Sequence, residues 1–242
     1  MTRWRAAGLH LIISLLVGTI AFCLLYFVYY PQPFFVAAGA DVLVLILLGV
    51  DVALGPLLTL AVFKSGKWGM KFDLAVIALL QLGALAYGSF VMWTSRPVFI
   101  VAAVDRIEMV YANDLAPADL ALAERPEFRN LPLFGPVYVD VRKAVGDEAL
   151  EVVNAALAGK DKHRQPKYYV PWTKNTVAQL KTRDISTTNP LLTQDQRAII
   201  NQVKIVHQNT FVLPLQGRTD DFSVFLDNST GRVEAVAQGS VW

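Results

Sequence analysis

The stretch that decides the fold is VLVLILLGVDVALGPLLTLAVF, at residues 42–63. It is almost wholly apolar, and a bilayer core about 30 Å thick needs roughly 20 apolar helical residues to cross it. Two further stretches of this kind occupy residues 6–29 and 74–93. We therefore expect a membrane α-helical bundle of three transmembrane helices within residues 1–95, followed by a soluble domain at residues 96–242.

Composition changes along the chain in the same way. The 242 residues are 54% hydrophobic, with a mean hydropathy of +0.41, whereas a soluble domain is about 45–50% apolar. Most of the charge lies in residues 96–242, and the net charge of +2 does not favour a nucleic-acid partner. The single cysteine, Cys23, lies in the first apolar stretch. The soluble part therefore has no internal disulfide and no thiol ligand or nucleophile.

Basic residues predict the orientation of the spans. They precede the first span and fill the loop between the second and third, at Arg3, Arg5, Lys64, Lys67 and Lys71, whereas residues 30–41 contain none. The positive-inside rule then places the N-terminus in the cytoplasm and the soluble domain outside. The Ala38–Ala40 triplet has a small-x-small cleavage pattern. However, the first apolar run is longer than a signal-peptide core and the triplet lies too far beyond it, so we expect the span to be retained.

Asp51 is the most unusual residue in the spans because a charge at that depth costs about 2.5–3.5 kcal/mol on insertion scales. Counting the helical rise from the cytoplasmic ends predicts Tyr87 and Gln81 as its neighbours. One interpretation is a proton- or ion-sensing carboxyl, or a contact with a partner's span. The other, which we favour, is a hydrogen bond that fixes the bundle.

Small residues predict where the spans bend and approach each other. Gly55 and Pro56 should kink the second span, because proline removes a backbone donor. The pairs Gly49/Ala53 and Ala84/Gly88 have the spacing that allows close helix packing.

The soluble part mixes strand and helix patterns. We expect strands at residues 98–104, 106–111, 136–141, 211–215, 223–226 and 232–237, and helices at residues 117–124, 148–157 and 194–207. Thr193 and Gln196 form a capping box at the start of the last helix. This order predicts an α+β domain with a small, mainly antiparallel sheet.

No familiar catalytic pattern occurs in the sequence. The three histidines, His10, His163 and His207, do not share metal-ligand spacing, and there is no nucleophile elbow, P-loop or dinucleotide fingerprint. We therefore expect no enzyme activity, cofactor or metal site. The aromatic segment at residues 168–172 is different. Tyr168, Tyr169 and Trp172 are either exposed partner contacts or core packing, and the sequence leaves both open.

Five segments carry a resemblance to a known family. They are WRAAGLHL at residues 4–11, LGVDVALGPLLTL at 48–60, KFDLAVIALLQ at 71–81, RPVF at 96–99 and VDR at 104–106. Together they resemble the type IV pilin accessory proteins of the TfpX/TfpZ kind. The likeness is strong over the first 110 or so residues and less distinctive beyond.

The resemblance implies a non-enzymatic protein of the bacterial inner membrane with a periplasmic domain. It would assist or modulate the assembly and surface display of a cognate major pilin. The polar positions that match are His10, Asp51, Asp73 and Gln81. Two alternatives remain, a membrane-anchored periplasmic ligand-binding sensor and, more weakly, a membrane hydrolase. The sensor would need a signalling output, for which the cytoplasmic side offers only a short tail and one loop.

Overall fold

The computed structural model describes residues 2–185, 192–218 and 220–239. The chain forms two compact units. The helical unit comprises Met1–Tyr29 and Ala40–Thr94, and the sheet unit comprises Tyr30–Gly39 and Ser95–Trp242. The segment between the first two spans therefore folds with the sheet unit, whereas a simple division at residue 95 leaves it with the membrane part.

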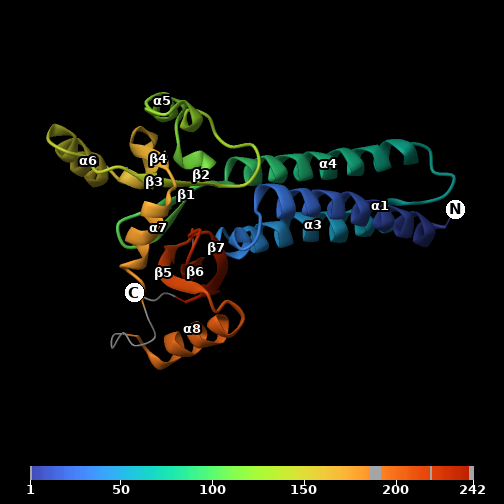
Figure 1. Ribbon diagram of the computed structural model, residues 1–242. Coiled ribbons are helices and arrows are strands. Elements are labelled where there is room, and N and C mark those ends of the chain that lie inside the picture. The colour runs from blue at the N-terminus through green and yellow to red at the C-terminus, as the bar shows by residue number, and fades with distance from the viewer. Residues whose placement is uncertain (1, 186–191, 219, 240–242) are drawn as a thin grey trace. The chain divides into compact units, whose positions relative to one another are not determined.

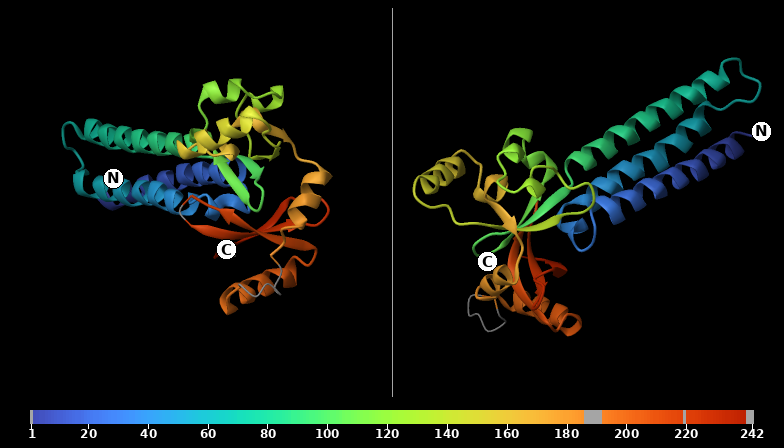
Figure 2. Two further views of the ribbon diagram at one scale, coloured as in Figure 1. Left: turned by 90° about the vertical axis from the view of Figure 1, so that its left-hand side faces the viewer. Right: turned by 45° about the horizontal axis from the view of Figure 1, so that its top comes forward.

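Three long helices build the helical unit, and Figures 1 and 2 show them running side by side. They are α1 (Arg3–Leu24), which continues as a π-helical turn, η1 (Leu25–Tyr29), then α3 (Ala40–Val62) and α4 (Met70–Thr94). Each is long and apolar enough to cross a membrane. The prediction of three long apolar helices is therefore confirmed within the part of the chain that is described.

Glycines mark some of the close approaches between these helices. A methyl group built at Gly88 on α4 would lie 2.4 Å from Cδ1 of Leu47 on α3, so glycine permits this contact. One built at Gly18 on α1 would lie 3.5 Å from Cδ2 of Leu48. At Gly49 no atom lies within 4 Å of the built methyl. Of the two predicted small-residue pairs, Gly49/Ala53 and Ala84/Gly88, only the second therefore contains a glycine that closely approaches a neighbouring helix.

The sheet unit is built on one mixed sheet of seven strands in the order β4-β3-β1-β2-β5-β6-β7. The strands are β1 (Pro97–Ala102), β2 (Ile107–Tyr111), β3 (Val137–Val141), β4 (Tyr169–Pro171), β5 (Thr210–Gln216), β6 (Asp221–Asp227) and β7 (Val233–Gln238). The helices are α2 (Phe34–Ala37), α5 (Pro117–Ala121), α6 (Asp147–Leu157), α7 (Lys174–Lys181) and α8 (Gln194–Val206), with 3-10 turns η2 (Ala112–Asp114), η3 (Pro126–Phe128), η4 (Lys162–Arg164) and η5 (Pro166–Tyr168).

The prediction of a small, mainly antiparallel sheet is wrong, although the α+β class is confirmed. The pairs β1–β3 and β2–β5 are parallel, and they join the two ends of the domain into one sheet. The other pairs are antiparallel. Sequence patterns indicate hairpins between neighbouring strands, but a parallel pair needs a long crossover, so its partner cannot be recognised locally.

The core lies on both sides of the central strands. Every residue of β1 and β2 is buried. One cluster packs Phe99 of β1 against Phe128 and Tyr169. The other packs Ile200 of α8 against Phe225 of β6. Helix α8 begins at the predicted capping box, where Thr193 and Gln196 exchange hydrogen bonds with each other's backbone N–H groups.

The segment Tyr30–Gly39 is held firmly in the sheet unit. The side chain of Tyr30 is fully buried, which raises the pKa of its hydroxyl. The ring of Phe34 lies 6.5 Å from the ring of Tyr138 on β3, and the carbonyl of Ala37 accepts a hydrogen bond from the backbone N–H of Arg218 at 3.4 Å. The chain therefore crosses between the two units at three places rather than one.

Candidate functional site

Asp51 faces the interior of the helical unit. Its side chain is only 8% exposed and lines a cavity of about 140 Å³ between the three helices. Asp51 is the lining residue from α3, and the others come from α1 and α4: His10, Ile13, Ser14, Val17, Gly18, Ala78, Gln81, Leu82 and Leu85. The acid therefore faces the neighbouring helices, the arrangement expected for a charged residue in a helix that spans a membrane.

Gln81 of α4 lies beside Asp51. Its Nε2 donates a hydrogen bond to the backbone carbonyl of Asp51 at 3.0 Å. Its Oε1 is buried and accepts no hydrogen bond from any described residue. Gly55 makes this approach possible, because a methyl group built there would lie 2.1 Å from Gln81 Nε2. Pro56, the next residue, lies inside α3.

Tyr87 does not join this cluster. It is 72% exposed, and it lies six residues after Gln81, which corresponds to about 240° around a helix. The expectation that Tyr87 neighbours Asp51 is therefore wrong, because it rested on depth in the membrane and took no account of the direction of the side chain.

Thr59 of α3 also belongs to this polar cluster, although no pattern considered above pointed to it. Its hydroxyl lies 2.6 Å from Nδ1 of His10 and links α3 to α1, and Thr59 is 2% exposed. Asp51, Gly55 and Thr59 recur every four residues, so they share one face of α3. That spacing of small and polar residues in an apolar helix is the signal that could have identified it.

The cluster offers an acceptor inside a small cavity. Within the described residues, none donates a hydrogen bond to the carboxyl group of Asp51. A cavity of about 140 Å³ can hold a few water molecules, because each occupies about 30 Å³ in the liquid. The site can therefore receive water or a polar group from another helix.

The aromatic segment of the sheet unit is mostly core. Tyr168 and Tyr169 are each 1% exposed, so the alternative of exposed partner contacts is wrong for these two residues. Tyr169 packs 5.1 Å from the ring of Phe99, and its burial raises the pKa of its hydroxyl, which donates to the carbonyl of His163. Tyr169 is the first residue of the short strand β4 and its ring faces the core, whereas Tyr168 ends the turn η5 and its ring is covered by the cationic side chains of Arg142, Lys162 and Lys167.

Trp172 is only partly exposed. Its Nε1 donates to the carbonyl of Thr230 at 3.1 Å, and its ring lies 5.4 Å from that of Tyr138. Much of the indole therefore holds the turn between β6 and β7. A role for Trp172 in partner contact stays a prediction that concerns only its exposed edge.

Helix α6 presents an apolar face to solvent. Leu150 is 67% exposed, Val153 55% and Leu157 83%, and their spacing places them on one side of the helix. On the opposite side, Glu148 is held by Arg142 at 2.7 Å, and this hydrogen-bonded pair lowers the pKa of Glu148 to about 2. The sequence predicted a helix at residues 148–157, but not that its apolar side would be exposed.

Comparison with known proteins places the chain in a family. The sequence profile described as "Fimbrial assembly protein FimB" matches residues 1–39. The serogroup I fimbrial assembly protein of Dichelobacter nodosus is 30% identical over 241 residues, covering 96% of this chain and 93% of the relative. The serogroup E1 protein of the same organism is 29% identical over 241 residues, with the same coverage.

A third relative is similar over a shorter stretch. The fimbrial assembly protein of Dichelobacter nodosus serogroups C1 and C2 is 32% identical over 125 residues, covering 51% of this chain and 92% of the relative. No solved structure matches the chain. The full-length relatives span both the three long helices and the mixed sheet, and on this similarity the chain belongs to the fimbrial assembly protein family.

Proposed function

We propose that this protein is a non-enzymatic accessory factor of a type IV pilus system, of the TfpX/TfpZ kind, that assists assembly and surface display of a cognate major pilin. The observation that carries the proposal is the 30% identity to a fimbrial assembly protein over 96% of the chain. The likeness includes the helical unit and the sheet unit together, which favours a role that uses both.

The proposed location is the bacterial inner membrane. The basic residues before the first long helix and between the second and third favour a cytoplasmic N-terminus. In this orientation the sheet unit is periplasmic. A pilin awaiting assembly is held in the same membrane by one apolar helix and carries a globular domain outside, so each unit of the accessory protein has a counterpart to contact.

Within the membrane, we infer that Asp51 and its cavity receive a polar group of the pilin helix. An acceptor without a donor in a low-dielectric site gains most from an incoming hydrogen bond. Burial of Asp51 at 8% exposure restricts access to a partner that reaches between the helices. The alternative, that Asp51 only fixes the bundle, predicts that polar substitutes at this position retain full function.

Outside the membrane, we infer that the exposed face of α6 contacts the globular domain of the pilin. Leu150, Val153 and Leu157 form a contiguous apolar strip that no other part of the described sheet unit covers. Exposed apolar side chains grouped in this way are typical of interaction sites. The exposed edge of Trp172 is the second candidate contact in this unit.

Deletion of the gene tests the main proposal. We expect fewer surface pili at an unchanged level of pilin synthesis, with restoration by the wild-type gene. Normal pili in the deletion strain would contradict the proposal.

In-cell photocrosslinking tests direct contact with pilin. The probe is placed at Leu54 on α3, at Leu150 or Leu157 on α6, and at Trp172. Leu122 provides the matched control, because it is 63% exposed in the same unit but lies outside the apolar strip. We expect pilin adducts from the first set and none from Leu122. Equal capture at Leu122 and Leu157, or no capture anywhere, would rule out the proposed contacts.

A further inference from the structure

The topology of the sheet unit opens a crevice at one edge of the sheet. β1 and β3 are parallel neighbours, with Ala102 opposite Asp140, so their C-terminal ends lie together at the same edge of the sheet. After these ends, the chain from β1 continues into β2, which pairs on one side of β1. The chain from β3 leads toward β4, which pairs on the opposite side of β3. Chains that leave adjacent parallel strands in opposite directions create the crevice where ligands of open α/β sheets bind.

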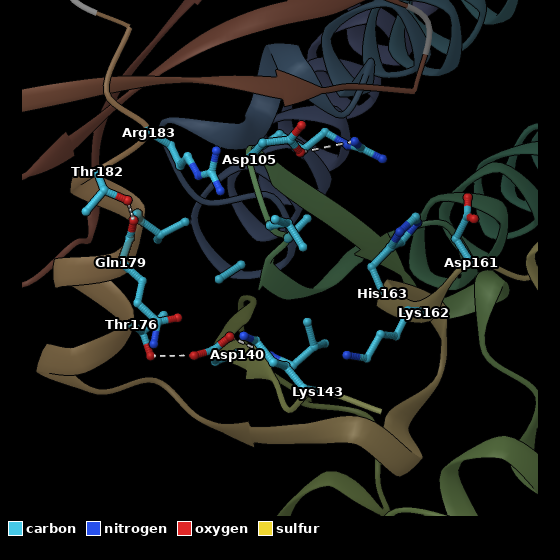
Figure 3. A pocket seen from close by; sticks show the side chains of 16 residues that line it. Asp105, Asp140, Lys143, Asp161, Lys162, His163, Thr176, Gln179, Thr182 and Arg183 are labelled. Atoms are coloured by element: carbon cyan, nitrogen blue, oxygen red, sulfur yellow. Dashed lines mark hydrogen bonds and ion pairs between the residues drawn. The ribbon is translucent and has the colours of Figure 1, made fainter. Parts of the chain in front are cut away.

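A cavity of about 440 Å³ occupies this edge (Figure 3). Its volume falls within the range of about 300–1,000 Å³ that is usual for small-molecule sites. The walls are the loop after β1, the loop after β3, the turn η4 and one side of α7 with the two residues after it. All of these elements belong to the sheet unit.

Most acidic groups at the cavity already have partners. Asp140 accepts hydrogen bonds from the hydroxyl of Thr176 and the backbone N–H of Val141, each at 2.7 Å. Asp105 pairs with Arg106 at 3.3 Å, and Arg106 also pairs with the buried Glu108. The charge of Asp105 is offset by Arg106, whereas Asp140 has only uncharged donors and keeps its negative charge.

The cationic groups of the cavity are not balanced in this way. Lys143, Lys162 and Arg183 line it, and none forms an ion pair within the described residues. Asp161 is the one lining acid of the described chain whose side chain forms neither a hydrogen bond nor an ion pair. Figure 3 shows Lys162 and Arg183 on opposite walls. The lining contains four cationic side chains with Arg106 included and three acidic ones, so it carries one net positive charge, and its cations lie on more than one side of the cavity.

Lys162 is the least solvated of the three. It is half-buried, and its Nζ lies 5.5 Å from the centre of the Tyr168 ring. Burial is the main cause that lowers the pKa of its ammonium, and the nearby Arg142 lowers it further, while Asp140 and Glu148 partly offset the change. A further negative charge in the cavity would stabilise the ammonium.

We propose that this cavity binds a small water-soluble anion with at least two carboxylate or phosphate charges, held among Lys143, Lys162 and Arg183. The polar, cationic lining fits such a ligand better than an apolar one. Two or more charges are needed because the cations are distributed around the cavity. The proposal does not depend on contact with pilin.

Isothermal titration of the full chain in uncharged detergent micelles at low salt tests the site. Citrate and inorganic phosphate are the two probes, because they represent carboxylate and phosphate chemistry. We expect saturable binding of at least one probe at a single site, weakened as salt rises. Lys162→Gln and Arg183→Gln should each weaken binding about tenfold, as loss of a charge-assisted hydrogen bond predicts.

Lys181→Gln is the matched control, because Lys181 ends α7 two residues before Arg183, is exposed and does not line the cavity. We expect it to bind like the wild type. Absence of saturable binding for both anions would overturn the proposal, and so would equal weakening by Lys181→Gln and Lys162→Gln. Circular dichroism of each variant verifies that it is folded. None of these outcomes bears on surface pili, so failure here leaves the proposed function standing.

Discussion

Replacing Gly55 by alanine tests the packing of α3 against α4. The new methyl carbon would lie 2.1 Å from Nε2 of Gln81 and 2.6 Å from its Oε1. Such distances are far inside van der Waals contact, so the amide of Gln81 must move. It then loses its 3.0 Å hydrogen bond to the carbonyl of Asp51.

The expected cost follows from three contributions. A hydrogen bond between membrane helices contributes about 0.6 kcal/mol on average and about 1.7 at most. Overpacking costs about 1–3 kcal/mol, while alanine gains up to about 1 kcal/mol over glycine in a helix. We therefore expect Gly55→Ala to lower the free energy of unfolding of the helical unit by about 2 kcal/mol.

Two other glycines provide matched controls. Gly49 on α3 and Gly83 on α4 have no atom within 4 Å of a built methyl group. Alanine at either position should leave the stability unchanged or slightly raised. The measurement is unfolding of the full chain by sodium dodecyl sulfate in mixed micelles, followed by energy transfer between labels on α1 and α4.

A double-mutant cycle identifies the contact responsible. In a Gln81→Ala background the side chain that obstructs the methyl group is gone, so Gly55→Ala should cost little. The two substitutions should therefore deviate from additivity by about 2 kcal/mol. Additivity within about 0.5 kcal/mol, the usual result for independent sites, would refute the packing described here.

The remaining predictions concern the sheet unit. Gly217→Ala places a methyl 2.6 Å from the carbonyl oxygen of Asp220 and 2.8 Å from that of Ala37. We expect the free energy of unfolding to fall by about 1–3 kcal/mol, measured by urea unfolding. An unchanged unfolding midpoint would contradict this close contact. The Arg142–Glu148 pair predicts a pH dependence, because the pKa of Glu148 falls from 4.5 to about 2 in the folded chain. A lowered carboxyl pKa adds stability that is complete above pH 4.5 and lost as the pH falls toward 2. The measurement is the rate of amide hydrogen exchange in α6, corrected for its intrinsic pH dependence. At pH 6 exchange should be slower in the wild type than in Glu148→Gln, and near pH 2 the two rates should converge. A difference that stays constant with pH would show that the Arg142–Glu148 pair is not its cause.

Asp51 has a functional prediction of its own. If its cavity receives a polar group of the pilin helix, Asp51→Leu should reduce surface pili strongly at normal protein abundance, and Asp51→Asn should reduce them less. The measurement is surface pilin in cells that express each variant at matched levels. Full function in both variants would leave Asp51 no role in assembly.

The amino-acid sequence alone determined the features that depend on neighbouring residues. Unbroken apolar runs define three long helices, since each needs only its own length and composition to cross a bilayer. The capping box at Thr193 and Gln196 marks the start of α8, because its hydrogen bonds lie within one turn. Counting the helical rise along the two spans predicted that Gln81 lies near Asp51, because the rise per residue of a helix is constant.

Only the tertiary structure decided which faces are covered and which strands meet. The parallel pairing of β1 with β3 joins strands separated by β2, the turns η2 and η3 and the helix α5, and no local pattern indicates it. The same is true of Tyr30–Gly39, which folds with the sheet unit, and of Tyr168 and Tyr169, whose burial the sequence left open. The apolar face of α6 shows the reason most clearly. Periodicity indicates that a helix has an apolar face. Whether that face is exposed depends on how the helix is attached to the domain, and here Arg142 binds Glu148 on the side of α6 opposite the apolar face.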